Sequence, residues 1–204
     1  QGGVLLATGS GSITIMNSEF VDNRSYWAGG ALAIRTFDGT VAIDNSLFEG
    51  NRSVRSSGGA IANWMNGEDV YELDEFAELF NTLLIDNCEF FGNLAQRSSG
   101  GALYTEGDFS GPIRVEINTT DFSYNEASSD GGAIWAKRMY DEILINESTF
   151  DLNEGRSGGA LGFNQQILFT GTNLDISSNT ASSNGGGIYA SDAVMVLLVD
   201  SKGR

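Results

Sequence analysis

Carboxylates are the main candidates for chemistry in this chain, because it has no histidine and a single cysteine. Histidine is the commonest general base near neutral pH and the commonest metal ligand. Four acidic residues hold the same place in a repeated pattern, one position before a recurring phenylalanine: Glu19, Glu89, Asp121 and Asp175. If the repeats stack, Glu89 and Asp121 lie about 5 Å apart, a distance that favours a bridging cation or a shared proton. The pair is a candidate Ca²⁺ site or an acid–base pair acting on a glycan, and the alternative is a solvated acidic face.

A second column of equivalent positions is partly aromatic. Two positions after the alanine of a recurring Gly-Gly-Ala motif lie Ala33, Ala62, Tyr104, Trp135, Gly162 and Tyr189. Side chains alternate between the two faces of a strand, so this column points outward if the apolar residue before it points inward. An exposed ladder of Tyr104, Trp135 and Tyr189 is a possible binding face for sugar rings or for another protein. The alternative is packing between neighbouring strands on a flat sheet face.

Four asparagines begin an Asn-x-Ser/Thr sequence, which is the acceptor signal for glycosylation in secreted proteins. Asn23 and Asn51 belong to a column that we expect to point inward, where a glycan would disrupt packing. Asn118 and Asn146 share a position that is expected to face outward. These two residues are the candidate glycan attachment sites.

Cys88 sits two positions before a recurring phenylalanine, where other repeats have Ser18, Ser46, Thr120 and Ser148. We therefore interpret Cys88 as a small side chain that replaces serine or threonine at this position, rather than as a nucleophile. A single cysteine also means that the chain forms no internal disulfide.

These columns depend on repeats that carry two linked motifs. Phe-x-x-Asn occurs five times, with its residues at Phe20, Phe48, Phe90, Phe122, Phe150, Asn23, Asn51, Asn93, Asn125 and Asn153. Ile176 and Asn179 form a sixth, degenerate copy. The first glycines of successive glycine pairs lie at positions 2, 29, 58, 100, 131, 158 and 185, mostly 27 to 31 residues apart. A period of this size is typical of a solenoid.

The fold class that these repeats predict is all-β. Short alternating runs such as Val115-Glu116-Ile117 precede each Phe motif, and no amphipathic helix recurs between them. We therefore expect a right-handed, single-stranded parallel β-helix of the pectin-lyase type, with about seven coils stacked at roughly 4.8 Å. The phenylalanines would stack in the core, the asparagines would form an amide ladder, and the glycine pairs would allow positive φ and close backbone approach.

One step of the repeat is longer than the others, which places an insertion of about 14 residues at positions 64–80. The insertion is acidic, and its apolar residues have roughly helical spacing. It is either a recognition element that protrudes from the rod or a cover for a sheet edge.

The formal net charge of −16 excludes several classes of partner. Without a basic patch, nucleic acid binding is not expected. No apolar run is long enough for a transmembrane helix. Residues 1–204 read as one β-helix domain, which we expect to be a segment of a longer extracellular solenoid.

The paired motif resembles the repeats of the polymorphic outer membrane proteins, the autotransporter adhesins of Chlamydia. Segments 48–61, 90–103 and 122–134 carry the similarity most clearly, and it extends over nearly the whole chain. Similar repeats occur in surface proteins of algae and protists. The resemblance implies a surface-exposed β-helix used in adhesion or in oligomer and fibre formation, and it implies no catalytic residues.

Two functional hypotheses follow from these observations. The first is a non-enzymatic surface protein, either an adhesin that binds a receptor or surface glycans through its side faces, or a fibre unit that assembles with other chains. The alternative is a β-helix that binds or degrades polysaccharides, since this fold also hosts such enzymes. Apart from Ca²⁺ at Glu89 and Asp121, no cofactor is expected.

Overall fold

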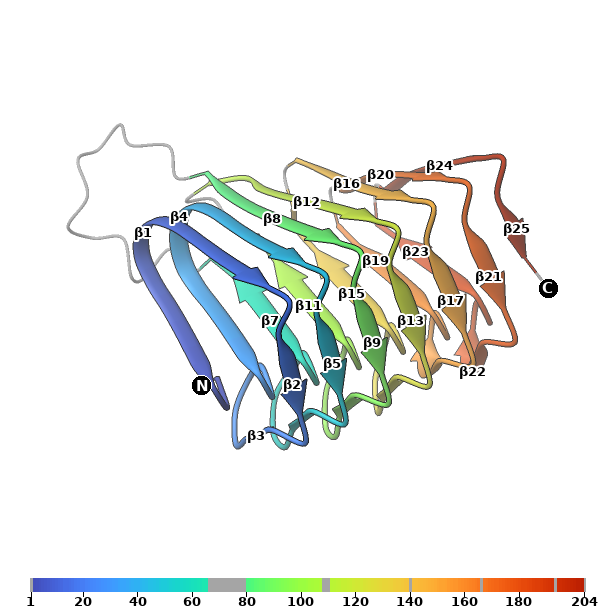
Figure 1. The fold of residues 1–204 in the computed structure, drawn as a ribbon. Coiled ribbons are helices and arrows are strands. Elements are labelled where there is room, and N and C mark those ends of the chain that lie inside the picture. Colours follow the sequence, from blue (N-terminus) through green and yellow to red (C-terminus); the bar gives the residue numbers. More distant parts are fainter. Residues whose placement is uncertain are drawn as a thin grey trace.

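The structure is a computed structural model that describes residues 2–65, 80–107, 111–139, 141–165, 167–192 and 194–203. This part of the chain consists of strands and turns. It contains no helix that is long and apolar enough to cross a membrane. The strands pair in parallel and form three sheets that extend along a rod (Figure 1). The predicted parallel β-helix is confirmed.

Each complete turn of the solenoid contributes strands to all three sheets. The largest sheet contains β1 (Leu5–Met16), β4 (Leu32–Asp44), β7 (Ile61–Trp64), β8 (Asn81–Asp86), β11 (Leu103–Glu106), β12 (Ile113–Asn118), β15 (Ile134–Lys137), β16 (Glu142–Asn146), β19 (Leu161–Asn164), β20 (Ile167–Thr172), β23 (Ile188–Ser191) and β24 (Val194–Val199). The second contains β2 (Glu19–Val21), β5 (Leu47–Glu49), β9 (Glu89–Phe91), β13 (Asp121–Ser123), β17 (Thr149–Asp151), β21 (Asp175–Ser177) and β25 (Lys202–Gly203). The third contains β3 (Arg24–Ser25), β6 (Arg52–Ser53), β10 (Leu94–Ala95), β14 (Glu126–Ala127), β18 (Glu154–Ser157) and β22 (Thr180–Asn184).

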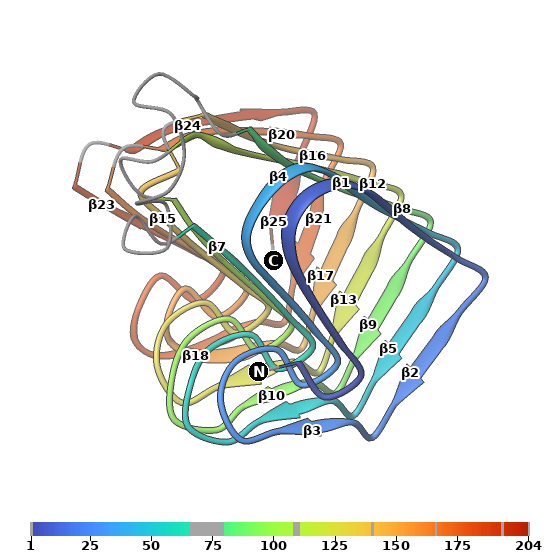
Figure 2. The ribbon, with the colours of Figure 1, turned by 90° about the vertical axis from the view of Figure 1, so that its left-hand side faces the viewer.

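Figure 2 looks along the rod from its N-terminal end, and the chain runs clockwise as it recedes from the viewer. The solenoid is therefore right-handed. In the described residues about six turns are complete, because β23, β24 and β25 are not followed by a strand of the third sheet. The expected number of about seven coils was therefore too high by one. The predicted insertion at 64–80 lies almost entirely outside the described residues.

The recurring phenylalanines stack in the core as one column. Neighbouring rings from Phe20 to Phe150 have centroids 4.7–4.9 Å apart and planes within 3–7° of parallel. All but Phe20 are fully buried. The centroid spacing equals the distance between neighbouring strands, so one ring per turn fills this side of the core without a gap.

The asparagines that follow form a continuous ladder with more bonds than the motif suggested. The side-chain oxygen of Asn93 accepts from the backbone N–H and the side-chain amide of Asn51, at 3.0 and 3.1 Å. The Asn93 amide donates to Asn125 at 2.9 Å and to the backbone oxygen of Phe48 at 2.8 Å. Asn51, Asn125 and Asn153 repeat this pattern, so each buried amide is satisfied on both sides.

Left-handed backbone conformations mark three corners of each turn. The first corner has φ of 45–56° at Asn17, Asn45, Asn87, Thr119, Glu147, Asn173 and Asp200. The second has φ of 54–62° at Asp22, Gly50, Gly92, Tyr124, Leu152 and Ser178. The third has φ of 61–68° at the first glycine of every pair: Gly2, Gly29, Gly58, Gly100, Gly131, Gly158 and Gly185. The second glycine of a pair is required for a different reason, since a Cβ on Gly59 would lie 1.9 Å from the backbone oxygen of Gly101 in the next turn.

Cys88 occupies a buried position beside the first corner. Its Sγ donates to the backbone oxygen of Asp86 at 3.0 Å, as the hydroxyls of Ser46 and Ser148 do to the equivalent oxygens of their own turns. Burial raises the pKa of the Cys88 thiol to about 11. The thiolate, which is the reactive form, is therefore scarce at neutral pH.

We predict that replacing Asn93 with alanine destabilises the rod by about 3 kcal/mol or more, because it leaves two donors of Asn51 without their acceptor in the core. Urea unfolding followed by circular dichroism measures the change. Asn146→Ala is the control, since Asn146 is only half-buried and makes one side-chain bond to Asn118; it should cost less than about 1 kcal/mol. If both variants lowered the free energy of unfolding by the same amount, a structural role for the ladder would be contradicted.

We predict that Gly59→Ala destabilises the protein by about 3 kcal/mol or more, because the added methyl collides with the backbone of the next turn. Gly92→Ala adds a methyl at φ +62° with no atom within 4 Å of it, so only the left-handed strain of about 1–2 kcal/mol applies. Thermal unfolding of the two variants compares the cost of a collision with the next turn, at position 59, with the cost of a positive φ alone, at position 92. If Gly92→Ala were the more damaging, close approach would not be the reason for the second glycine.

We predict that a thiol reagent modifies Cys88 roughly a hundredfold more slowly in the native protein than in urea at pH 8, because burial and a raised pKa both suppress the thiolate. The rate of colour release from a chromogenic disulfide measures this. A native rate close to that in urea would mean that the thiol is accessible and ionised.

Candidate binding groove

The aromatic column lies on the outer side of the largest sheet. Tyr104 of β11 pairs with Trp135 of β15, Trp135 pairs with Gly162 of β19, and Gly162 pairs with Tyr189 of β23. Trp135 retains only 8% of its exposure, and Tyr104 and Tyr189 are half-buried, so the column is less exposed than an open ladder on a bare sheet face would be. The loops that follow the strands of the third sheet curl back beside β7, β15 and β23 and form a second wall (Figure 2).

Trp135 owes its orientation to the glycine beside it. A Cβ built on Gly162 would lie 2.3 Å from Cε3 and 2.6 Å from Cζ3 of the indole. The ring therefore occupies the space that a side chain at position 162 would need. Because Gly162 separates Trp135 from Tyr189 along the column, the indole fills the gap between the two aromatic positions.

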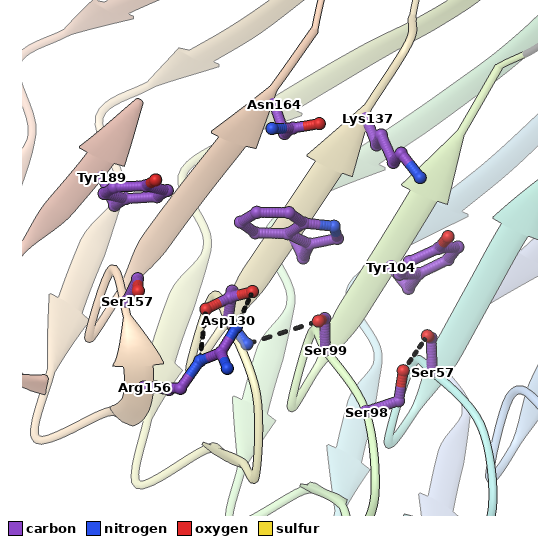
Figure 3. A pocket seen from close by; sticks show the side chains of 11 residues that line it. Ser57, Ser98, Ser99, Tyr104, Asp130, Lys137, Arg156, Ser157, Asn164 and Tyr189 are labelled. Atoms are coloured by element: carbon purple, nitrogen blue, oxygen red, sulfur yellow. Dashed lines mark hydrogen bonds and ion pairs between the residues drawn. The ribbon is translucent and has the colours of Figure 1, made fainter. Parts of the chain in front are cut away.

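Two hollows follow one another along this wall. The first has a volume of about 350 Å³ and is lined by Ser57, Ser98, Ser99, Tyr104, Asp130, Trp135, Lys137, Arg156, Ser157, Asn164 and Tyr189 (Figure 3). The second has a volume of about 230 Å³ and is lined by Trp27, Ala28, Ser56, Ser57, Trp64, Tyr104 and Glu106. The two hollows share Ser57 and Tyr104. We refer to all the residues that line either hollow as the aromatic groove. All three tryptophans of the chain belong to it.

The loop wall of the groove is polar and internally bonded. The carboxylate of Asp130 accepts from Nε and Nη2 of Arg156, both at 3.3 Å. The backbone N–H of Asp130 donates to the hydroxyl of Ser99 at 3.3 Å, and the hydroxyls of Ser57 and Ser98 lie 2.8 Å apart (Figure 3). These contacts link neighbouring turns and fix the wall.

Glu106 lies at the end of β11 among donors. Its carboxylate accepts from the Tyr104 hydroxyl and from Arg138, and the amino group of Lys137 lies 3.5 Å away. Burial alone would raise the pKa of Glu106, but these donors outweigh it and hold the pKa below its ordinary value. Burial and the neighbouring carboxylate raise the pKa of Tyr104. Glu106 is therefore an ionised acceptor and Tyr104 a protonated donor.

The carboxylate column predicted from the sequence lies on the second sheet, away from the groove. Glu89 and Asp121 are direct partners on β9 and β13, as expected. Asp121 also accepts a hydrogen bond from Thr149 at 2.5 Å, and Asp175 forms an ion pair with Lys202 at 2.9 Å. Among the described residues, no group of three or more acidic or cysteine side chains is arranged to hold a metal ion. Calcium binding by Glu89 and Asp121 stays a prediction.

The candidate glycan sites Asn118 and Asn146 lie side by side on β12 and β16. Both are half-buried, and the Asn146 amide donates to the side-chain oxygen of Asn118 at 2.9 Å. A glycan on Asn146 would be attached to this same nitrogen, which would keep one N–H. Their modification stays a prediction.

Several groove residues escaped the sequence argument. Trp27 and Arg156 lie two positions before a glycine pair and Asp130 lies one before, but other repeats have different residue types there, and the same is true of Trp64 at the end of its strand. No recurring residue type therefore marked them. One signal was available, namely the serines that precede the glycine pairs: Ser56, Ser57, Ser98 and Ser99. They supply hydroxyls along the loop wall.

The comparisons agree with the motif-based expectation. Two segments, residues 119–137 and 173–191, match the model of the Chlamydia polymorphic membrane protein repeat. No curated protein and no solved structure matches the chain. The first segment runs from the corner before β13 to the end of β15, and the second covers the equivalent part of a later turn. The resemblance is thereby confirmed, and the chain contains repeats of the Chlamydia polymorphic membrane protein type, folded as a parallel β-solenoid.

Proposed function

We propose that this protein is a non-enzymatic surface protein, an adhesin module that binds its ligand in the aromatic groove. The repeat type is that of bacterial membrane proteins, which supports a location at the cell surface. The observation that carries the proposal is the gathering of all three tryptophans in one groove of an otherwise uniform rod.

The groove has the properties of a binding site formed before the ligand arrives. Tryptophan and tyrosine are enriched among residues that dominate binding energy. Trp135 is held over Gly162 by packing, and its strand is hydrogen-bonded to strands on both sides. Little side-chain entropy is therefore lost when a ligand contacts the indole, which favours affinity.

The charges in the groove favour binding over hydrolysis. A glycosidase needs a carboxylic acid with a raised pKa to protonate the leaving group. The pKa of Glu106 is lowered instead, and its oxygens are engaged by Tyr104 and Arg138. Asp130 is held by two bonds from Arg156. Both carboxylates therefore act as acceptors that order the groove.

The test is adhesion of protein-coated fluorescent beads to cultured animal cells. We expect Trp135→Ala to reduce bead retention roughly tenfold or more, as expected for a residue that dominates an interface. Trp135→Phe should retain much of the binding because it keeps a ring over Gly162. Tyr124→Ala is the matched control, since Tyr124 is an exposed aromatic residue at the second corner, outside the groove.

Circular dichroism and thermal unfolding of each variant separate lost binding from lost structure. Equal retention of wild-type and Trp135→Ala beads would contradict a role for the groove in adhesion. Wild-type protein that does not adhere but forms regular filaments in electron micrographs would favour the fibre-unit hypothesis instead.

A further inference from the structure

We infer that the ligand of the aromatic groove is an uncharged oligosaccharide chain that lies along the axis of the rod. This inference rests on the proposed function, because it names the ligand class for the same groove. Three features carry it: the spacing of the rings, the balance of charge, and the saturated backbone of the groove floor.

The rings are arranged as a series of platforms along the axis. Tyr104 and Trp135 lie on adjacent strands, and Tyr189 lies two strands beyond Trp135. Since neighbouring strands are about 4.8 Å apart, the rings are separated by about 5 Å and then about 10 Å, which is the scale of one and of two sugar rings in a chain. Each sugar ring has a face of C–H groups that can rest on an aromatic ring, as other apolar groups do.

The polar lining suits a ligand that carries many hydroxyl groups. Serine hydroxyls can donate and accept, and the side-chain oxygen of Asn164 can accept, while the Asn164 amide nitrogen already donates to Ser191 and Asp192. The Asp130 carboxylate and the Arg156 guanidinium offer planar groups of fixed orientation. An oligosaccharide with apolar ring faces and polar edges complements this combination of aromatic floor and polar wall.

The charge balance indicates that the ligand is uncharged. Lys137, Arg138 and Arg156 meet the carboxylates of Glu106 and Asp130, and every one of these five groups takes part in an ion pair. A polyanionic chain would have to break these pairs and approach a protein of net charge −16. A polycation would face Lys137 and Arg156, the cationic groups that line the groove.

The backbone of the floor argues against an extended peptide. Strands β11, β15 and β19 each have a hydrogen-bonded neighbour on both sides. No free strand edge is therefore available there for a peptide to pair with. A peptide along the axis would cross the strands and would depend on side chains to satisfy its N–H and C=O groups, whereas a sugar chain carries no such backbone.

Intrinsic tryptophan fluorescence provides the measurement, because all three tryptophans line the groove. The probes are neutral oligosaccharide series (maltose-, cellulose-, chitin- and galactan-derived) and two polyanions, polygalacturonate and heparin. We expect at least one neutral series to shift the emission, with affinity that rises with chain length. The affinity should change less than about twofold between low and high salt, because an uncharged ligand is not screened.

The variants test whether the signal comes from the groove. Isothermal titration calorimetry, which needs no tryptophan, should give a roughly tenfold or greater loss of affinity for Trp135→Ala. It should give partial recovery for Trp135→Phe and no change for Tyr124→Ala. Binding confined to the polyanions, with strong salt dependence, would overturn the inference, and so would the absence of binding to every neutral series.

The outcomes also separate this inference from the proposed function. If Trp135-dependent bead adhesion persists on cells treated with N- and O-glycosidases and no neutral series binds, the groove is an adhesive site for protein and the inference fails. If a neutral series binds in the groove but beads do not adhere, the inference stands and the adhesin proposal fails.

Discussion

The asparagine ladder is the interaction on which the rest of the structure depends. Each amide bonds to the turn before and the turn after, and it also fixes the backbone at the corner where the chain leaves the second sheet. These bonds hold successive turns in one register. That register places the phenylalanine rings one above another and aligns the glycine pairs so closely that their backbones leave no room for a side chain. An offset between two turns would leave buried asparagine amides without partners, which is costly. It would also separate the stacked rings and misalign the glycine pairs.

The sequence predicts the scaffold well, because the scaffold consists of repeated positions. Phe90 and Asn93 could be assigned to columns by comparison with Phe122 and Asn125, and the structure places them together. The left-handed corners were harder to foresee, since residues as different as Tyr124 and Leu152 occupy one of them. In that column the main chain sets the conformation and the side chain points away, so residue type carries little information.

The groove could be predicted only in part, for a related reason. Tyr104, Trp135 and Tyr189 share a repeat position and could be found, whereas Trp27, Asp130 and Arg156 come from the loops before the glycine pairs, where the residue type changes from turn to turn. Whether the column is exposed depended on those loops, which cover it. Gly162 looked like an interruption of the aromatic column, yet it provides the space that the Trp135 ring fills. An alignment records such a gap as a missing side chain and cannot show that a neighbour occupies it.

The turns also differ in where they tolerate a change of length. Two residues separate the strands at the first corner and two at the second, in every turn described there. The spacing varies in two places. One is the loop before the glycine pair, and the other is the connection between two successive strands of the largest sheet, as between β7 and β8 or between β11 and β12. The first of these segments forms a wall of the groove, and the second begins where Trp64, Glu106, Lys137 and Asn164 line or border it. Insertions and deletions can therefore accumulate at the rim of the groove while the ladder stays intact, so that one inherited scaffold can evolve, or be engineered, to recognise different partners.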